Sequence, residues 1–101
     1  MAEAHPVDEW QMESNEEEGI RVLQQTELEE RIAAAEAAAE RLGLTMPILV
    51  DGMDDAVSIA FAAWPERLVV IDAAGHIVDP GRPGPDGFEP DAAAAALASV
   101  L

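Results

Sequence analysis

Two histidines are the side chains of this sequence whose ordinary pKa lies near neutrality, and His5 is the stronger candidate for chemistry. An imidazole with a pKa of about 6.5 can be a hydrogen-bond donor or a base, so His5 could act on a bound ligand in either way. The interpretation that we favour is a solvated histidine near the chain end. His76 begins a predicted hairpin strand beside a turn, where surface placement is ordinary, and we assign it no function.

Cysteine is absent from the 101 residues. Disulfides, thiolate metal sites and thiol-based redox chemistry therefore cannot be built from these residues. We predict no catalytic residue in this sequence.

Carboxylates are the remaining candidates for a metal site. Asp51, Asp54, Asp55 and residues 16–18 supply hard oxygen ligands of the kind that bind calcium or magnesium. Their spacing misses the EF-hand loop, and helix capping and a solvated acidic face explain them more simply. The glycine-rich residues 84–87 have no lysine and do not form a P-loop. We therefore expect no metal and no cofactor.

The net charge is −16, from 21 acidic and five basic residues. Such a charge repels phosphate backbones and anionic lipids, so nucleic acid and membranes are poor candidates for partners. No apolar run approaches the roughly 20 residues of a membrane helix, and residues 1–10 lack the pattern of a signal peptide. We therefore expect a cytoplasmic protein.

A long polar loop is predicted for residues 1–25, followed by a helix. Thr26 and Glu29 match a capping box at its start, Gly43 suits its C-terminal cap, and Glu27 is expected to pair with Arg31 on its outer side. Residues at helical period form its apolar face: Leu28, Ile32, Ala35, Ala39 and Leu42.

The remaining elements alternate between strand and helix. Residues 48–50 suit a strand buried on both faces, and a second helix runs from a cap at Asp54 to a stop at Pro65. A hairpin joins strands 68–71 and 76–78, residues 79–88 form a rigid loop, and a last helix begins at Pro90. The aromatic side chains Phe61, Trp64 and Phe88 are expected in a thin core, and Leu97, Val100 and Leu101 on the packing face of the last helix.

Three segments, in order, resemble one known family. They are Glu-Ala-His-Pro at residues 3–6 with Trp10 soon after, Pro-Glu-Arg-Leu at 65–68, and Gly-Pro-Asp-Gly-Phe at 84–88 before the last helix. Together with the order of elements, they resemble the iodothyronine deiodinases, which are redoxins of the thioredoxin fold. The resemblance implies an α/β fold with partial thioredoxin-like order (helix, strand, helix, β-hairpin, helix), and it makes Pro65 the family's cis-proline. We expect one domain over residues 1–101, with its α/β core at 26–101.

The resemblance also implies a reaction, the reductive removal of iodine from an aromatic ring by a selenocysteine or cysteine. That nucleophile and its segment are absent, so we expect an N-terminally truncated oxidoreductase-family protein that is inactive alone. In full-length relatives the substrate would be a small aromatic molecule or a thiol. The resemblance implies these substrate-site candidates: His5, Trp10, Pro65, Arg67 and Arg82. Arg82 lies one residue before the position of the family's substrate-binding arginine, which Pro83 occupies here.

Two alternatives remain open at this point. The chain can be a non-catalytic acidic binding module on a redoxin scaffold, because it has no cysteine. In the redoxin fold, strands 48–50 and 68–71 flank central strands that this sequence lacks. The two strands are therefore expected either to pair directly or to be joined through another chain in an oligomer.

Overall fold

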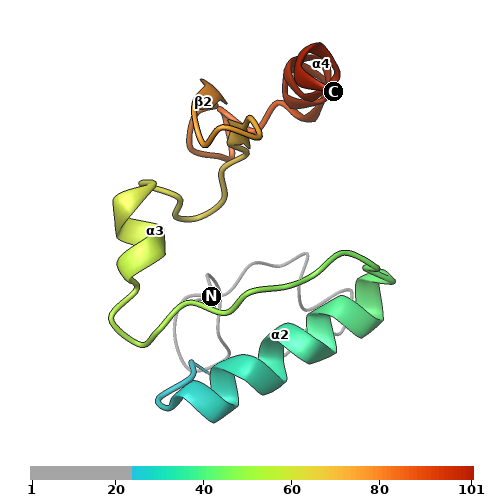
Figure 1. Ribbon diagram of the computed structural model, residues 1–101. Helices are drawn as coiled ribbons and strands as arrows, with labels where there is room; N and C mark the ends of the chain where they lie inside the picture. Colours follow the sequence, from blue (N-terminus) through green and yellow to red (C-terminus); the bar gives the residue numbers. More distant parts are fainter. Residues whose placement is uncertain (1–23) are drawn as a thin grey trace. The chain divides into compact units, whose positions relative to one another are not determined.

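The computed structural model describes residues 24–101, so the candidates His5 and Trp10 and most of the predicted loop at 1–25 lie outside the described residues. The chain divides into two compact units, Met1–Ala56 and Val57–Leu101. Figure 1 shows their helices and strands along the chain. The expected single domain stays a prediction.

Helix α2 (Leu28–Leu42) is the main described element of the first unit. Gly43 ends it in a left-handed conformation, and the N–H groups of Gly43 and Leu44 donate to the carbonyls of Glu40 and Ala39. This Schellman arrangement confirms the predicted cap. The predicted capping box is wrong, since the N-cap is Glu27, which makes no side-chain cap bond.

Thr26 bonds Glu30 instead of Glu29. Its backbone N–H and its hydroxyl both donate to Glu30 Oε2, at 2.8 and 3.2 Å. The backbone bond from Thr26 is the largest of the three causes that lower the pKa of Glu30, ahead of the Thr26 hydroxyl and a backbone bond from Glu27, because such bonds stabilise the ionised carboxylate. The helix thus begins after Thr26, and the carboxylate that Thr26 can bond is that of Glu30, one helical turn further along the chain.

Arg31 is a buried side chain of α2, with 2% of its surface exposed, so the predicted outer pair with Glu27 is wrong. Its Nη1 donates to the Gly52 carbonyl at 2.6 Å and to Asp55 Oδ1 at 2.7 Å. Asp55 has a left-handed backbone, with φ of 55°. A cation on the helix therefore fixes the turn at residues 51–55.

Residues 48–50 form no strand in the part of the chain that the structure describes, which corrects the prediction. Leu49 is 94% exposed, whereas Ile48 and Val50 line a small apolar cavity with Ile32 and Ala35 of α2. The segment keeps the alternation of a strand but packs on a helix, because no described strand lies beside it to form a ladder.

Helix α3 (Ala56–Ala60) begins at the boundary of the two units, and the Ala56 N–H donates to Asp54 Oδ1 at 3.4 Å, as the predicted cap requires. The helix ends well before Pro65, which corrects its expected length. Ala62 has φ of 46°, and the N–H groups of Ala62 and Ala63 donate to the carbonyls of Ile59 and Ser58. This Schellman turn ends the helix without need of the proline.

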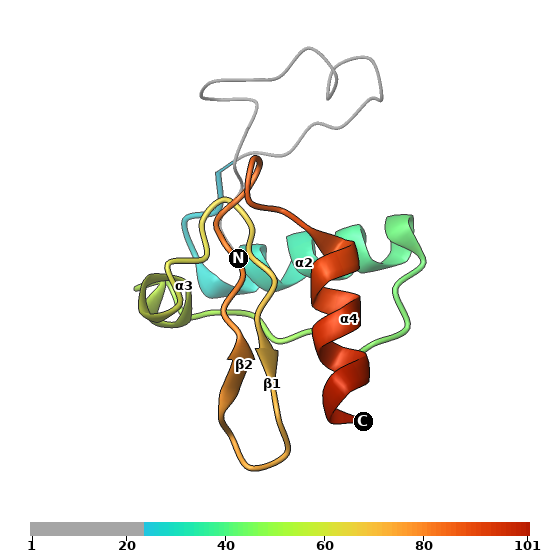
Figure 2. The same ribbon diagram turned by 90° about the horizontal axis from the view of Figure 1, so that it is seen from above.

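The second unit pairs a hairpin with a helix. Strands β1 (Val70–Ile71) and β2 (Ile77–Asp79) are antiparallel, with a bulge between their two paired positions. Asp72 Oδ1 accepts from the N–H groups of Ala74 and His76, which fixes the predicted turn. Helix α4 (Pro90–Val100), with proline in its first turn as predicted, packs against both strands (Figure 2).

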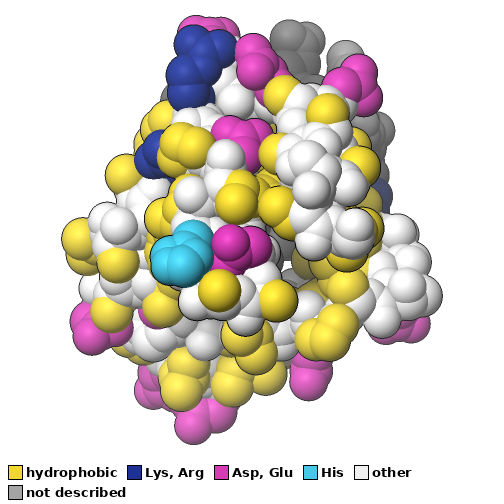
Figure 3. Space-filling view, turned by 45° about the horizontal axis from the view of Figure 1, so that its top comes forward, with side chains coloured by type: hydrophobic (Ala, Val, Ile, Leu, Met, Phe, Trp, Pro, Cys, Tyr) yellow, Lys and Arg dark blue, Asp and Glu magenta, His cyan; other side chains and the backbone are white. Residues whose placement is uncertain are grey.

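Large apolar side chains stay exposed in this small fold. Among the described residues, only Ala35 and Val70 are buried hydrophobic residues. Trp64 is 62% exposed, and the other side chains expected in the core or on the packing face of the last helix are also exposed: Phe61, Phe88, Leu97, Val100 and Leu101. Figure 3 shows hydrophobic side chains spread over the visible face. A two-stranded sheet with one helix has too few layers to enclose them.

The described residues thus combine helices with one two-stranded antiparallel sheet, in agreement with a mixed α/β class. The thioredoxin-like order stays a prediction. No helix of residues 24–101 has the length and apolar character to cross a membrane.

Candidate functional site

Arg67 belongs to the second unit and lies three residues before the start of β1. Its Nε donates to the Pro80 carbonyl at 2.8 Å, its Nη1 to the Phe61 carbonyl at 3.0 Å, and its Nη2 to the Gly81 carbonyl at 3.2 Å. The planar guanidinium can reach these three oxygens at once because its donors point in fixed directions. Arg67 therefore joins the segment after α3 to the loop after β2.

Pro65 follows a cis peptide bond from Trp64, which confirms the cis-proline that the resemblance implied. It stands two residues before Arg67 in the same segment. A second cis bond joins Gly84 to Pro85. The segments at residues 65–68 and 84–88, which carry the family resemblance in the second unit, therefore each contain a cis proline.

These two segments are in direct contact. The Gly84 N–H donates to the Glu66 carbonyl at 2.8 Å. The backbone of Gly81, with φ of 56°, lies so close to the Leu68 carbonyl that a Cβ at position 81 would overlap that oxygen. Residues 65–68 and 81–88 therefore form one substructure, although a hairpin separates them in sequence.

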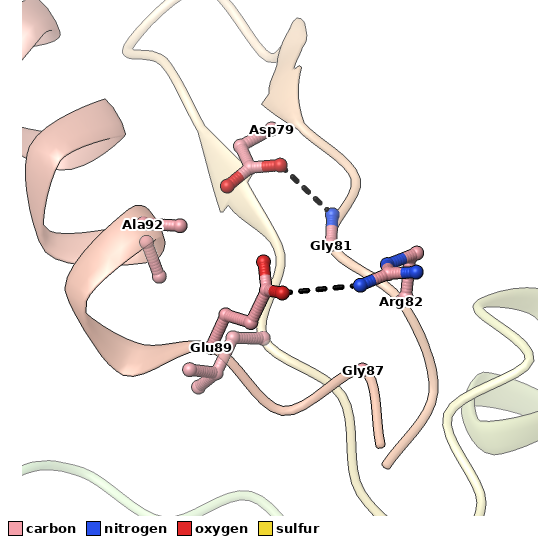
Figure 4. A pocket seen from close by; sticks show the side chains of 8 residues that line it. Asp79, Gly81, Arg82, Gly87, Glu89 and Ala92 are labelled. Atoms are coloured by element: carbon pink, nitrogen blue, oxygen red, sulfur yellow. Dashed lines mark hydrogen bonds and ion pairs between the residues drawn. The ribbon is translucent and has the colours of Figure 1, made fainter. Parts of the chain in front are cut away.

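A cavity of about 130 Å³ opens beside this substructure (Figure 4). It is lined by Leu68, Asp79, Gly81, Arg82, Gly87, Glu89, Ala92 and Ala93. Asp79 Oδ1 accepts from the Gly81 N–H at 3.0 Å, and Arg82 Nη2 donates to Glu89 Oε1 at 3.0 Å. The Arg82 side chain is 69% exposed, so most of its donors face solvent.

The three site candidates that the structure describes thus lie in one unit, with different roles. Arg67 holds backbone carbonyls, Arg82 borders the cavity, and Pro65 lies in the segment that precedes β1. These groups can orient a ligand by charge and hydrogen bonding. The sequence supplies no thiol that could attack it.

Sequence reasoning missed Asp79 and Glu89, which both line the cavity. Asp79 had a readable signal, because an aspartate two residues before a glycine often bonds that backbone N–H in a turn. Glu89 directly precedes the Pro90 that starts α4, where an acidic residue suits the positive end of the helix. Its pairing with Arg82 depends on how the loop folds, which the sequence does not state.

Residues 24–101 bring together no cluster of three or more histidine, aspartate or glutamate side chains suited to a metal ion. The predicted surface position of His76 is confirmed, and its Nδ1 lies 3.5 Å from Asp72 Oδ2.

Comparisons with known proteins bear on this geometry. The model of a family described as iodothyronine deiodinase matches residues 1–100. The chain is 34% identical over 89 residues to type I iodothyronine deiodinase of Xenopus laevis. This match covers 88% of the present chain and 33% of the relative. It is 34% identical over 87 residues to thyroxine 5-deiodinase of Gallus gallus. This match covers 86% of the present chain and 32% of the relative. The chain thus spans about a third of the length of these relatives, and no solved structure matches it.

Proposed function

Because this chain belongs to the iodothyronine deiodinase family, we propose that it is the substrate-positioning part of a reductive deiodination system. In this proposal it binds an iodinated aromatic molecule but carries no reducing nucleophile of its own. The absence of cysteine from the 101 residues supports the second half of the proposal.

The observation that carries the first half is the contact between the two segments of the second unit. Arg67 and the bond from Gly84 to Glu66 hold the loop at residues 81–88 against the segment at 65–68. Arg82 lines the cavity, and its side chain is 69% exposed, which supports a role in contacting a ligand. A guanidinium in that position suits a carboxylate or phenolate, because such charge-assisted bonds are strong and directional.

Titration calorimetry of the full chain with thyroxine tests this proposal. We expect measurable binding, weakened about fivefold in Arg82→Ala, since one partly solvated charge-assisted bond contributes about 1 kcal/mol. Arg41→Ala, which removes the same charge from the exposed end of α2, is the matched control and should bind as the parent does.

Iodide release provides the second measurement. With excess dithiothreitol, the chain alone is expected to release no iodide from thyroxine. Release above the protein-free rate would show that the nucleophile lies within these residues. Failure of thyroxine to bind would remove the positioning role.

The net charge of −16 favours a second candidate function, a non-catalytic acidic binding module. Its partner would be cationic, and its binding would weaken steeply with salt. Thyroxine binding that depends on Arg82 separates the first candidate from this one.

A further inference from the structure

The cavity beside Arg82 carries both signs of charge. Its charged lining residues are Asp79, Arg82 and Glu89, so carboxylates outnumber the guanidinium. A wholly anionic ligand would be attracted by Arg82 and repelled by the carboxylates, and a wholly cationic ligand would meet the reverse. Because like charges oppose either kind of ligand, the cavity is best matched by a ligand end that carries one positive and one negative group.

Each carboxylate of the cavity has one oxygen in use and one oxygen available. Asp79 Oδ1 accepts from the Gly81 N–H at 3.0 Å, and Glu89 Oε1 accepts from Arg82 Nη2 at 3.0 Å. No group of residues 24–101 donates a hydrogen bond to Asp79 Oδ2 or Glu89 Oε2. Figure 4 shows these second oxygens turned toward the space between Asp79, Glu89 and Ala92. Two acceptors beside one space suit an ammonium group, which can donate to several oxygens at once.

Arg82 can bind the negative group of the same ligand. Its side chain is 69% exposed, and its hydrogen bond within the described residues goes to Glu89. A guanidinium has more donors than this bond uses, so a second carboxylate can bind Arg82 without displacing Glu89. The cavity thus offers donors for a carboxylate next to acceptors for an ammonium.

The size of the cavity limits which part of a ligand can enter. Its volume is about 130 Å³, well below the ~300–1,000 Å³ of pockets that enclose a drug-sized ligand. Small side chains at Gly87, Ala92 and Ala93 leave this space open. The amino and carboxyl groups of an amino acid fit in such a volume, whereas two iodinated rings would remain outside it.

We propose that this cavity binds the amino-acid end of an iodinated amino acid such as thyroxine, with the ammonium on Asp79 and Glu89 and the carboxylate on Arg82. The inference rests on the proposed substrate-positioning function and adds the orientation of the ligand, whose charged end lies inside the cavity and whose rings lie outside. Asp79 and Glu89 then select for ligands with a free amino group.

Calorimetry of the full chain at constant ionic strength compares thyroxine with tetraiodothyropropionic acid, which lacks only the amino group. We expect the parent chain to bind thyroxine about fivefold more tightly, since the acid cannot bond the two carboxylates. In Asp79→Asn this preference should disappear, because thyroxine binds more weakly while the acid binds as before or better. Asparagine keeps an oxygen for the Gly81 N–H. Asp91→Asn removes the same charge from α4 outside the cavity lining, and this matched control should keep the preference.

Two further variants extend the test. Glu89→Gln keeps an acceptor for Arg82 and should also reduce the preference for thyroxine over the acid. Arg82→Ala should weaken the binding of thyroxine and of the acid, but not that of tetraiodothyronamine, which has the amino group and lacks the carboxylate. Circular dichroism checks that each variant keeps the secondary structure of the parent chain.

The possible failures can be told apart. Equal binding of thyroxine and the acid by the parent chain would refute the ammonium site, whereas weaker binding of both in Arg82→Ala would still support substrate positioning. Equal weakening of both ligands in Asp79→Asn would show that Asp79 acts only on the loop, and would overturn the inference. Absence of thyroxine binding would refute the proposed function and this inference together.

Discussion

Arg67 and Arg31 use their charge to hold backbone carbonyls. Arg67 donates to three of them, and Arg31 donates to the Gly52 carbonyl and to the Asp55 carboxylate. In both cases the carbonyls belong to irregular segments, which have no ladder or helix to satisfy them. Each arginine therefore fixes a loop that apolar packing alone would leave loose in so thin a core.

Replacing Arg67 tests this role. Arg67→Lys keeps the charge but cannot reach three separate oxygens, so we expect the free energy of unfolding to fall by about 1–3 kcal/mol. Urea denaturation followed by circular dichroism measures it. Arg82→Lys is the control, because an exposed ion pair contributes about 0–1 kcal/mol. Equal, small losses in both variants would show that Arg67 does not hold the loops.

Glu30 provides a test by titration. Its pKa is lowered by the bonds from Thr26, so the folded chain binds this proton less readily than the unfolded chain. The contribution to stability is thus complete above the unfolded pKa, about 4.3 for glutamate, and is lost as pH falls through the lower folded pKa.

Side-chain carboxyl NMR should therefore give Glu30 a pKa below its ordinary value. In Thr26→Val the pKa should rise only in part, because the hydroxyl is lost while the backbone N–H, the larger cause, remains. A value at or above the ordinary range in the parent chain would contradict the bonding described.

The family resemblance singled out Pro65, Arg67 and Arg82, and the structure places them in one unit, while their role toward a substrate stays a prediction. The partners of Arg67 could not be predicted from the sequence, because every residue has a backbone carbonyl and residue types do not show which carbonyl accepts a bond. The burial of Arg31 was missed for a related reason, as its partner Asp55 lies 24 residues away. Sequence patterns show neighbours along a helix, not those that a turn brings in.

At the scale of elements, local signals predicted α2, α4 and the hairpin turn well. Gly43, Pro90 and Asp72 each act within a turn of their own position. The strand at residues 48–50 failed because a strand exists only through a partner. The predicted length of α3 was wrong because the helix is ended by Ala62 in the left-handed region, which alanine does not usually prefer.

The close approach of the Gly81 backbone to Leu68 gives a test of the loop. Gly81→Ala would face both a positive φ and overlap with the Leu68 carbonyl, so we expect a loss of about 2–4 kcal/mol of stability. Gly75→Ala, at φ of 88° in open space, is the control and should lose about 1–2 kcal/mol. Thermal or urea unfolding compares them, and an equal loss would show that the loop can move away from the strand.

At the scale of the whole molecule, a high negative charge accompanies a small amount of buried apolar surface. The net charge is −16, and the described residues bury few large side chains. Repulsion among like charges favours expanded states of the chain. The small buried apolar surface offsets this repulsion only weakly. The sequence showed the charge and the thin core directly, whereas the division into two units depends on contacts that composition does not reveal.

Salt should therefore stabilise the chain. We expect the urea midpoint to rise between about 0.02 and 0.5 M sodium chloride, as screening shortens the range of repulsion from about 20 Å to a few ångströms. Tetramethylammonium chloride at the same ionic strength is the control and should act similarly. A rise with sodium alone would indicate a specific sodium site, and no rise would mean that repulsion is unimportant.

The three hydrogen bonds of Arg67 order a loop without protecting its amide protons from isotope exchange. Structural order and exchange protection therefore differ in this loop, although the two are often treated as one property. Arg67 bonds the carbonyls of Phe61, Pro80 and Gly81 and covers no amide proton. In the loop at residues 81–88, the N–H groups of Gly81, Gly84, Gly87 and Phe88 donate to Asp79, Glu66, Pro83 and Pro85. Deuterium would accordingly exchange slowly at these four positions, in a pattern that follows the acceptors rather than the rigidity of the backbone.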